Sequence, residues 1–298
     1  MNLAGVLAPI PTPFDEQGDV DTARLRTALT RWLQTPLAGF VILGSTGEAP
    51  LLDEAEADRV VACARDLVPR GRPFIVGTGR ESTRAAIDAT RRAASLGAEA
   101  VLVRTPSFFK TQMTADAFVR HYTAVADAAP VPVLLYNVTA VTGVSLPVEA
   151  VSTLATHPNI AGMKESNGDV PRVAALAAVV PQGFWLLAGS AVTFHEALRA
   201  GASGGILALA SVVPEACARL FELTSTGRHD EARALQQQML PLASLLGSMH
   251  GVPAIKAALK LVGCDAGFVR SPLVPLDERF MAEVGEAIAS LEVTRAAS

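Results

Sequence analysis

The sequence of 298 residues predicts an α/β protein, a (β/α)8 TIM barrel with additional C-terminal helices. Eight short runs rich in valine, isoleucine and leucine each precede a longer stretch with helical spacing. The runs are almost wholly apolar instead of alternating, which is typical of parallel strands buried on both faces. An open doubly wound sheet is the alternative, but eight strand–helix units favour the closed barrel.

The predicted strands recur at regular intervals along the chain. They are Gly5–Ile10, Gly39–Leu43, Pro73–Val76, Ala100–Val103, Val131–Tyr136, Ile160–Lys164, Trp185–Gly189 and Gly205–Leu209. Residues that can cap the first turn of a helix open the first four segments between them: Asp21, Asp53, Ser82 and Thr114.

The pattern changes in the last quarter of the chain. Residues 1–225 are expected to form the barrel, and residues 226–298 a helical extension packed on it. Helices are predicted there over residues 229–250, 252–262 and 277–291. No low-complexity linker separates the two parts, so the extension is interpreted as one more layer on the barrel.

Composition excludes several classes of protein. With 50% hydrophobic and 18% charged residues, the chain can build a self-sufficient core. The formal net charge of −4 provides no basic surface for nucleic acid or an anionic membrane. The three cysteines lie far apart and form no CxxC pair, so a reducing cytoplasm is the expected location.

Neither a signal peptide nor a membrane span is expected. The N-terminus has no basic region, and three prolines interrupt its apolar run. The uncharged stretch 173–194 is divided by Pro181, so neither half reaches the roughly 20 apolar residues that cross a bilayer.

Lys164 is the first candidate for chemistry, because reactive groups gather at the C-terminal ends of barrel strands. The chain has four lysines, and only Lys164 lies within an apolar strand. An amine there is desolvated, which favours its neutral form and makes it a nucleophile towards a carbonyl carbon. The alternatives are a lysine that reaches solvent from the strand end, or an ion pair with Glu165.

The other three lysines have ordinary explanations. Lys110 falls in a polar loop. Lys256 and Lys260 are four residues apart on a predicted helix, and we expect both on its solvated face.

Tyr136 ends the strand before the one that carries Lys164, so the two side chains should meet at the same rim. A phenol beside such a lysine can move protons to and from the reacting oxygen. The alternative is a tyrosine whose ring belongs to the core and whose hydroxyl contacts solvent.

The turn Gly44-Ser45-Thr46-Gly47-Glu48 follows the second predicted strand. Clustered backbone N–H groups and two hydroxyls suit a small anion such as a carboxylate, although the same residues also make ordinary tight turns. The five histidines show no ligand spacing, so no metal is expected. Gly77-Thr78-Gly79 lacks the third glycine of a dinucleotide fingerprint, and no cofactor is expected.

Four ordered motifs carry a family resemblance over the whole chain. They are Pro11-Thr12-Pro13-Phe14, the Gly44–Glu48 turn, Leu135-Tyr136-Asn137-Val138 and Gly162-Met163-Lys164-Glu165-Ser166. The chain resembles the dihydrodipicolinate synthase / N-acetylneuraminate lyase family of pyruvate-dependent class I aldolases. The resemblance implies a (β/α)8 barrel, usually a homotetramer.

The resemblance also implies roles for individual residues. Lys164 would form a Schiff base with C2 of a 2-oxo acid such as pyruvate, and Tyr136 would shuttle protons. Ser45 and Thr46 would bind the C1 carboxylate, and Ser166 would contact the aldol hydroxyl. Backbone atoms of Gly189 and Leu207 would line the pyruvate site.

Two departures bear on the second substrate. Dihydrodipicolinate synthases carry a tyrosine pair after the fourth strand and an arginine that binds the carboxylate of the aldehyde. This chain has Phe108-Phe109 and Val141 at those places, and Arg104 or Lys110 could supply a replacement cation. His157-Pro158-Asn159-Ile160 and Gly168-Asp169-Val170 look closer to the 4-hydroxy-2-oxoglutarate aldolase branch.

We therefore expect a lyase that cleaves, or forms, a 4-hydroxy-2-oxo acid from pyruvate and an aldehyde. The first alternative is 4-hydroxy-tetrahydrodipicolinate (dihydrodipicolinate) synthase, which condenses pyruvate with aspartate semialdehyde. A non-catalytic 2-oxo acid-binding protein on the same fold is the alternative from another class, because a fold alone does not confer activity.

Overall fold

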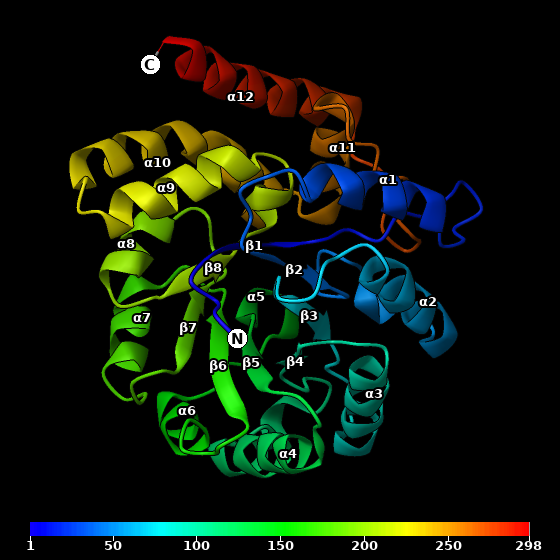
Figure 1. Ribbon diagram of the computed structural model, residues 1–298, viewed down its shortest axis with the longest axis vertical. Helices are drawn as coiled ribbons and strands as arrows, with labels where there is room; N and C mark the ends of the chain where they lie inside the picture. The colour runs from blue at the N-terminus through cyan, green and yellow to red at the C-terminus, as the bar shows by residue number, and fades with distance from the viewer. Residues whose placement is uncertain (298) are drawn as a thin grey trace.

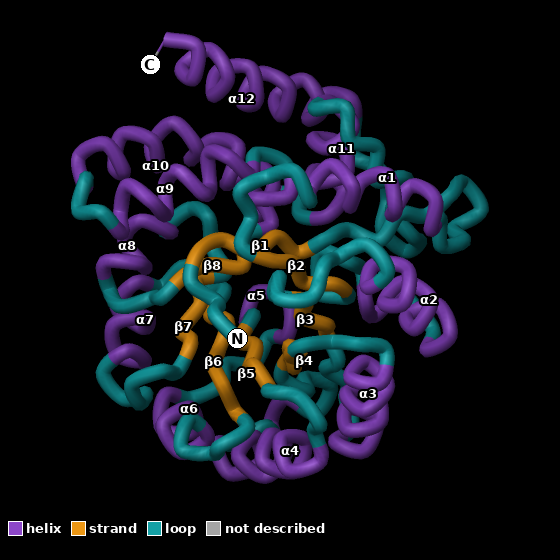
Figure 2. The backbone as a smooth tube through the Cα atoms, in the orientation of Figure 1, coloured by secondary structure: helices purple, strands orange, loops and turns teal. Residues whose placement is uncertain are grey.

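The computed structural model describes residues 1–297 and shows a closed barrel of eight parallel strands in the order β1 to β8. Figure 1 shows the strands at the centre, and Figure 2 shows them as a ring with most of the helices outside it. The strands are β1 (Gly5–Pro9), β2 (Gly39–Ile42), β3 (Phe74–Gly77), β4 (Ala100–Arg104), β5 (Val133–Asn137), β6 (Ile160–Glu165), β7 (Trp185–Ala188) and β8 (Gly204–Ile206). The predicted fold class is confirmed, and each of the eight apolar runs overlaps one strand.

Most strands contribute to two cores. Alternate residues such as Leu7, Val41 and Leu134 fill the inside of the barrel. Their neighbours, such as Ala8 and Leu135, face the layer between strands and helices. Because both faces are covered, the strands need apolar residues at nearly every position, which explains the absence of alternation in the sequence.

Nine helices of the described chain follow the strands. They are α1 (Thr22–Trp32), α2 (Glu54–Arg65), α3 (Thr83–Ser95), α4 (Ala115–Ala128), α5 (Thr139–Thr142), α6 (Val148–Leu154), α7 (Val170–Ala177), α8 (Phe194–Arg199) and α9 (Pro214–Ser225). The four expected capping residues all accept a hydrogen bond from the backbone N–H of the helix that they open. Local sequence therefore determines where these helices begin.

The C-terminal part is helical, as expected. It comprises α10 (His229–Ser244), α11 (Val252–Leu261) and α12 (Glu278–Ala297). The predicted helix 229–250 ends earlier, because its last turn widens into the π-helical segment η4 (Leu245–Met249). In Figure 1, α12 lies along the outer edge of the molecule beside α10 and α11.

The boundary between the expected barrel and its extension stays a prediction, and residue 298 lies outside the described residues. α10 packs on α8 and α9, and α11 packs on the 3₁₀ segment η3 (Ala208–Ser211) that follows β8. No helix within residues 1–297 combines the length and apolar character needed to cross a membrane.

Candidate active site

The register of three neighbouring strands brings Arg104, Tyr136 and Lys164 into one row. Arg104 on β4 pairs with Tyr136 on β5, and Tyr136 pairs with Lys164 on β6. Side chains paired in this way point to the same face of the sheet. Leu102 and Leu134, two residues earlier on their strands, fill the inside of the barrel. The row therefore faces inward, at the C-terminal ends of the strands.

Lys164 contacts Tyr136 directly. Its Nζ lies 3.5 Å from the phenol oxygen and 4.5 Å from the centroid of the ring. The lysine is only 7% exposed, which excludes a side chain that extends into solvent. The side chains of Lys164 and Tyr136 thus meet at the strand ends, as the sequence predicts.

Glu165 does not pair with Lys164. Its carboxylate binds Arg172 at 2.7 Å and accepts hydrogen bonds from the Asn137 side chain and the Asn167 N–H. Successive residues of a strand point to opposite faces, so Lys164 and Glu165 point apart. The ion-pair alternative for Lys164 is therefore excluded.

The phenol of Tyr136 links Lys164 to the turn after β2. Its oxygen lies 3.3 Å from Oγ of Ser45. Burial alone would raise the pKa of Tyr136, but the charge of Lys164 and the hydrogen bond with Ser45 outweigh it, and the pKa is lower than usual. A phenol with a lowered pKa ionises more readily, and its phenolate can accept a proton from a neighbouring ammonium group.

The turn that carries Ser45 and Thr46 has an unusual backbone. Leu43 and Glu48, at its two ends, have φ values of 58° and 54°. Non-glycine residues rarely adopt this left-handed conformation, which persists only where surrounding contacts hold it. The Thr12 hydroxyl supplies one such contact, because it donates to the carbonyl of Gly47 at 2.7 Å. Thr46 is buried within the turn.

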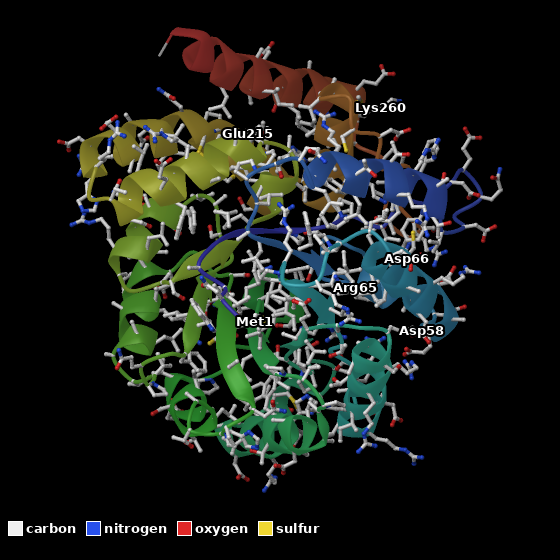
Figure 3. The ribbon with its side chains drawn as sticks, viewed as in Figure 1. Met1, Asp58, Arg65, Asp66, Glu215 and Lys260 are labelled. Atoms are coloured by element: carbon white, nitrogen blue, oxygen red, sulfur yellow. The ribbon has the colours of Figure 1, made fainter. Side chains whose placement is uncertain are left out.

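Lys256 also contacts the turn, and our expectation that it lies on a solvated face is wrong. It is 5% exposed, and its Nζ lies 2.7 Å from Oε1 of Glu48. The same ammonium donates to the carbonyls of Thr12 and Phe268. Lys260, one turn later on α11, is exposed at the outer edge of the molecule (Figure 3). Helix α11 thus connects the C-terminal part to the site.

The sequence offered one signal for Lys256. Lysine is scarce in this chain, and the scarcity that singled out Lys164 applied equally to Lys256. Its partner Glu48 is also buried, at 2% exposure, and accepts a further hydrogen bond from the N–H of Arg270. Buried charges in proteins are almost always paired, so each of the two residues requires the other.

Replacing Lys256 with methionine should lower the free energy of unfolding by about 3–5 kcal/mol, because Glu48 would then be a buried charge without its ion-pair partner. Lys260→Met makes the same chemical change on the exposed side of α11 and should alter stability by less than about 0.5 kcal/mol. Urea unfolding of both variants measures the difference. Equal effects of the two substitutions would contradict the structural role of the buried pair.

Three further predicted residues follow strand ends. Ser166 follows β6, and its buried hydroxyl makes no hydrogen bond with any described residue. Gly189 follows β7, and a Cβ there would come within 1.9 Å of the Ser166 hydroxyl oxygen and 2.9 Å of Cε of Lys164. Only glycine leaves room for both side chains. The backbone N–H of Gly189 itself donates to the carbonyl of Glu165.

Leu207 follows β8, and its side chain lies in the core outside the barrel. Its N–H donates to the carbonyl of Leu7. Only backbone atoms of Leu207 could therefore line a site at the strand ends, as the resemblance implies.

Two cavities adjoin Ser45 and Arg104. The first has a volume of about 320 Å³ and is also lined by Tyr136 and Arg80. The second, of about 690 Å³, has a largely apolar lining that includes Val141, Val252 and Leu273. Lys110 lines neither cavity. Phe108 and Phe109 are 77% and 68% exposed, so they present apolar surface to the exterior.

The donor set of the site suits an organic substrate. It consists of an amine, a phenol, hydroxyl groups and a guanidinium. Within residues 1–297, no three histidine, cysteine, aspartate or glutamate side chains come together in a way that could hold a metal ion.

Known proteins agree with this geometry. Residues 2–291 match the Dihydrodipicolinate synthetase family. The 4-hydroxy-tetrahydrodipicolinate synthase of an Exiguobacterium species is 34% identical over 98% of this chain and 99% of its own length. The synthase of Stenotrophomonas maltophilia is 37% identical over 93% of this chain and 92% of its own length.

Solved structures agree as well. The 4-hydroxy-tetrahydrodipicolinate synthase of Methylacidiphilum fumariolicum superposes with a TM-score of 0.93 at 29% identity, covering 99% of this chain and 98% of that one. The dihydrodipicolinate synthase of Acinetobacter baumannii, solved in complex with pyruvate, gives a TM-score of 0.93 at 31% identity, with 98% and 99% covered. The resemblance noted in the sequence is confirmed: this chain is an enzyme of the dihydrodipicolinate synthetase family, whose members are pyruvate-dependent class I aldolases.

Proposed function

We propose that Lys164 forms an imine with the C2 carbonyl of pyruvate and that the enzyme makes or breaks the bond between C3 of pyruvate and an aldehyde carbon. The observation that carries the proposal is a buried amine 3.5 Å from a phenol of lowered pKa, within an inward-facing row at the strand ends. The pyruvate complex of the similar Acinetobacter baumannii enzyme supports the choice of 2-oxo acid.

The proposed steps begin with the transfer of a proton from the ammonium of Lys164 to the phenolate of Tyr136. The neutral amine adds to C2 of pyruvate, and the resulting carbinolamine loses its oxygen as water when Tyr136 returns the proton. Tyr136 takes a proton from C3 of the imine, which gives an enamine. C3 of the enamine attacks the aldehyde carbon, and Tyr136 returns the proton to the aldehyde oxygen. Hydrolysis of the new imine releases the product and the amine of Lys164, and cleavage follows the same steps in reverse.

Ser45 and Thr46 are proposed to bind the C1 carboxylate of pyruvate. Ser45 contacts the phenol of Tyr136, and Thr46 is the next residue of the same buried turn. The buried hydroxyl of Ser166 is proposed to bind the hydroxyl formed when the aldehyde reacts. The homotetramer implied by the resemblance remains a prediction.

The first candidate reaction is that of 4-hydroxy-tetrahydrodipicolinate synthase, the condensation of pyruvate with aspartate semialdehyde. It is supported by the names of the relatives from Exiguobacterium, Stenotrophomonas maltophilia and Methylacidiphilum fumariolicum. These names support our alternative better than our main expectation, the cleavage of a 4-hydroxy-2-oxo acid.

Cleavage of a 4-hydroxy-2-oxo acid is the second candidate, and two observations favour it. Val141 takes the place of the carboxylate-binding arginine and is 69% exposed at the edge of the larger cavity. Phe108 and Phe109 take the place of the tyrosine pair and carry no hydroxyl for proton transfer.

Values of kcat/KM for the two reactions distinguish the candidates. If the enzyme is a synthase, condensation of pyruvate with aspartate semialdehyde should exceed cleavage of 4-hydroxy-2-oxoglutarate at least about tenfold, a difference of about 1.4 kcal/mol in transition-state stabilisation. The opposite ratio would establish the aldolase reaction. Trapping of the pyruvate imine with borohydride, followed by peptide mass analysis, tests the step that both reactions share.

A further inference from the structure

Arg104 has an unusual position for a charged residue. It is the last residue of β4, in register with Tyr136, and its side chain lies over Gly79. A Cβ on Gly79 would come within 2.5 Å of Cγ of Arg104, so the close approach requires glycine. The side chain is 21% exposed and lines both cavities.

One edge of the Arg104 guanidinium is already occupied. Nη1 donates to Oε1 of Glu81 at 2.7 Å and to the carbonyl of Thr105 at 3.2 Å. The other carboxylate oxygen of Glu81 accepts the N–H groups of Ser107 and Phe108. Glu81 thus connects the loop after β4 to Arg104 and holds the guanidinium in one orientation.

The opposite edge of Arg104 is free. Its Nε and Nη2 donate to no described residue. Two parallel N–H groups on one edge of a guanidinium match the two oxygens of a carboxylate. Arg80, the other cation that lines the smaller cavity, is fully engaged, since Glu54 binds Nε and Nη2 and the carbonyl of Gly79 accepts from Nη1.

The distance to Lys164 suits a short diacid. Strands lie about 4.8 Å apart, so the Cα atoms of Arg104 and Lys164, two strands apart, are separated by about 10 Å. Tyr136 contacts Lys164 and lines the smaller cavity together with Arg104, so a carbon chain that starts at an imine on Lys164 and passes Tyr136 would enter a cavity that Arg104 lines. Lys110, the other cation considered from the sequence, is exposed and lines neither cavity.

We propose that Arg104 is a specificity-determining residue, whose free Nε–Nη2 edge binds a second carboxylate at the far end of the substrate. The enzyme would therefore select substrates with a carboxylate at each end. This inference rests on the proposed imine at Lys164 and holds for either candidate reaction, because both second substrates carry such a group. Arg104 would serve in place of the arginine that Val141 replaces.

Two 2-oxo acids of equal length test the proposal without an aldehyde. 2-Oxoglutarate ends in a carboxylate, and 2-oxopentanoate ends in a methyl group. Their half-saturating concentrations are measured by borohydride trapping on Lys164, with pyruvate as the reference. We expect the unmodified enzyme to bind 2-oxoglutarate about 10- to 100-fold more tightly than 2-oxopentanoate.

Three variants test which residue causes the preference for 2-oxoglutarate over 2-oxopentanoate. Arg104→Met should remove it while leaving the half-saturating concentrations of pyruvate and 2-oxopentanoate within about threefold, which shows that the fold and the amine are intact. Arg104→Lys should retain only part of it, because an ammonium lacks the two-pronged edge. Lys110→Met, the matched control, should retain all of it.

The inference is overturned if the unmodified enzyme shows no preference, if the preference survives in Arg104→Met, or if Lys110→Met removes it. A failure to trap pyruvate on Lys164 in the unmodified enzyme would overturn the proposed function and this inference with it. The missing pyruvate adduct distinguishes that outcome from the others.

Discussion

Replacement of Lys164 with arginine should abolish imine formation and lower turnover by roughly 10⁴- to 10⁶-fold, the range for loss of a covalent nucleophile. A guanidinium keeps the positive charge beside Tyr136 but stays protonated and cannot add to a carbonyl carbon. With pyruvate and borohydride, the unmodified protein should gain the mass of pyruvic acid less one oxygen atom, on the peptide that contains Lys164. The variant should gain nothing.

Lys260→Arg is the matched control for this experiment. Lys260 is exposed on α11, so the same substitution there should leave turnover and trapping unchanged. Turnover retained within tenfold in Lys164→Arg, or a label on another lysine, would show that the chemistry does not pass through Lys164.

Replacement of Tyr136 with phenylalanine should lower turnover about 10²- to 10⁴-fold, the usual contribution of a positioned acid–base group. The ring that contacts Lys164 would remain, while the hydroxyl that moves the proton would be lost. Half-saturation by pyruvate should change much less, because the phenol acts on the proton and not on the carboxylate. Steady-state kinetics with imine trapping separates the two effects.

Tyr122→Phe provides the comparison for Tyr136. Tyr122 is the second of two tyrosines in the chain, is fully buried, and donates its hydroxyl to the carbonyl of Val103 at 3.1 Å. Its loss should cost about 1 kcal/mol of stability and leave turnover within a few-fold. Similar kinetic losses in both variants would mean that the effect at Tyr136 is structural.

The sequence by itself determined the barrel and predicted that Lys164 and Tyr136 meet at its strand ends. Buried parallel strands require continuous apolar runs, and a polar residue such as Asp53 caps the helix after it, so both features can be read locally. The meeting of Tyr136 and Lys164 followed from their places at the ends of successive strands, because such strands are neighbours in a barrel. The order of the motifs was enough to identify the family, which the relatives confirm.

Only the tertiary structure decided how the site is supported. Lys256 and Lys260 lie four residues apart on α11, and helical spacing places residues so spaced near the same face. Packing of α11 against the turn after β2 buries the first beside Glu48 and leaves the second in solvent. The sequence also did not indicate the ion pair of Arg104 with Glu81, because Glu81 lies in the loop after β3 and Arg104 lies at the end of β4. Ion pairs between distant segments depend on how elements pack, and helical or strand periodicity within one segment carries no information about them.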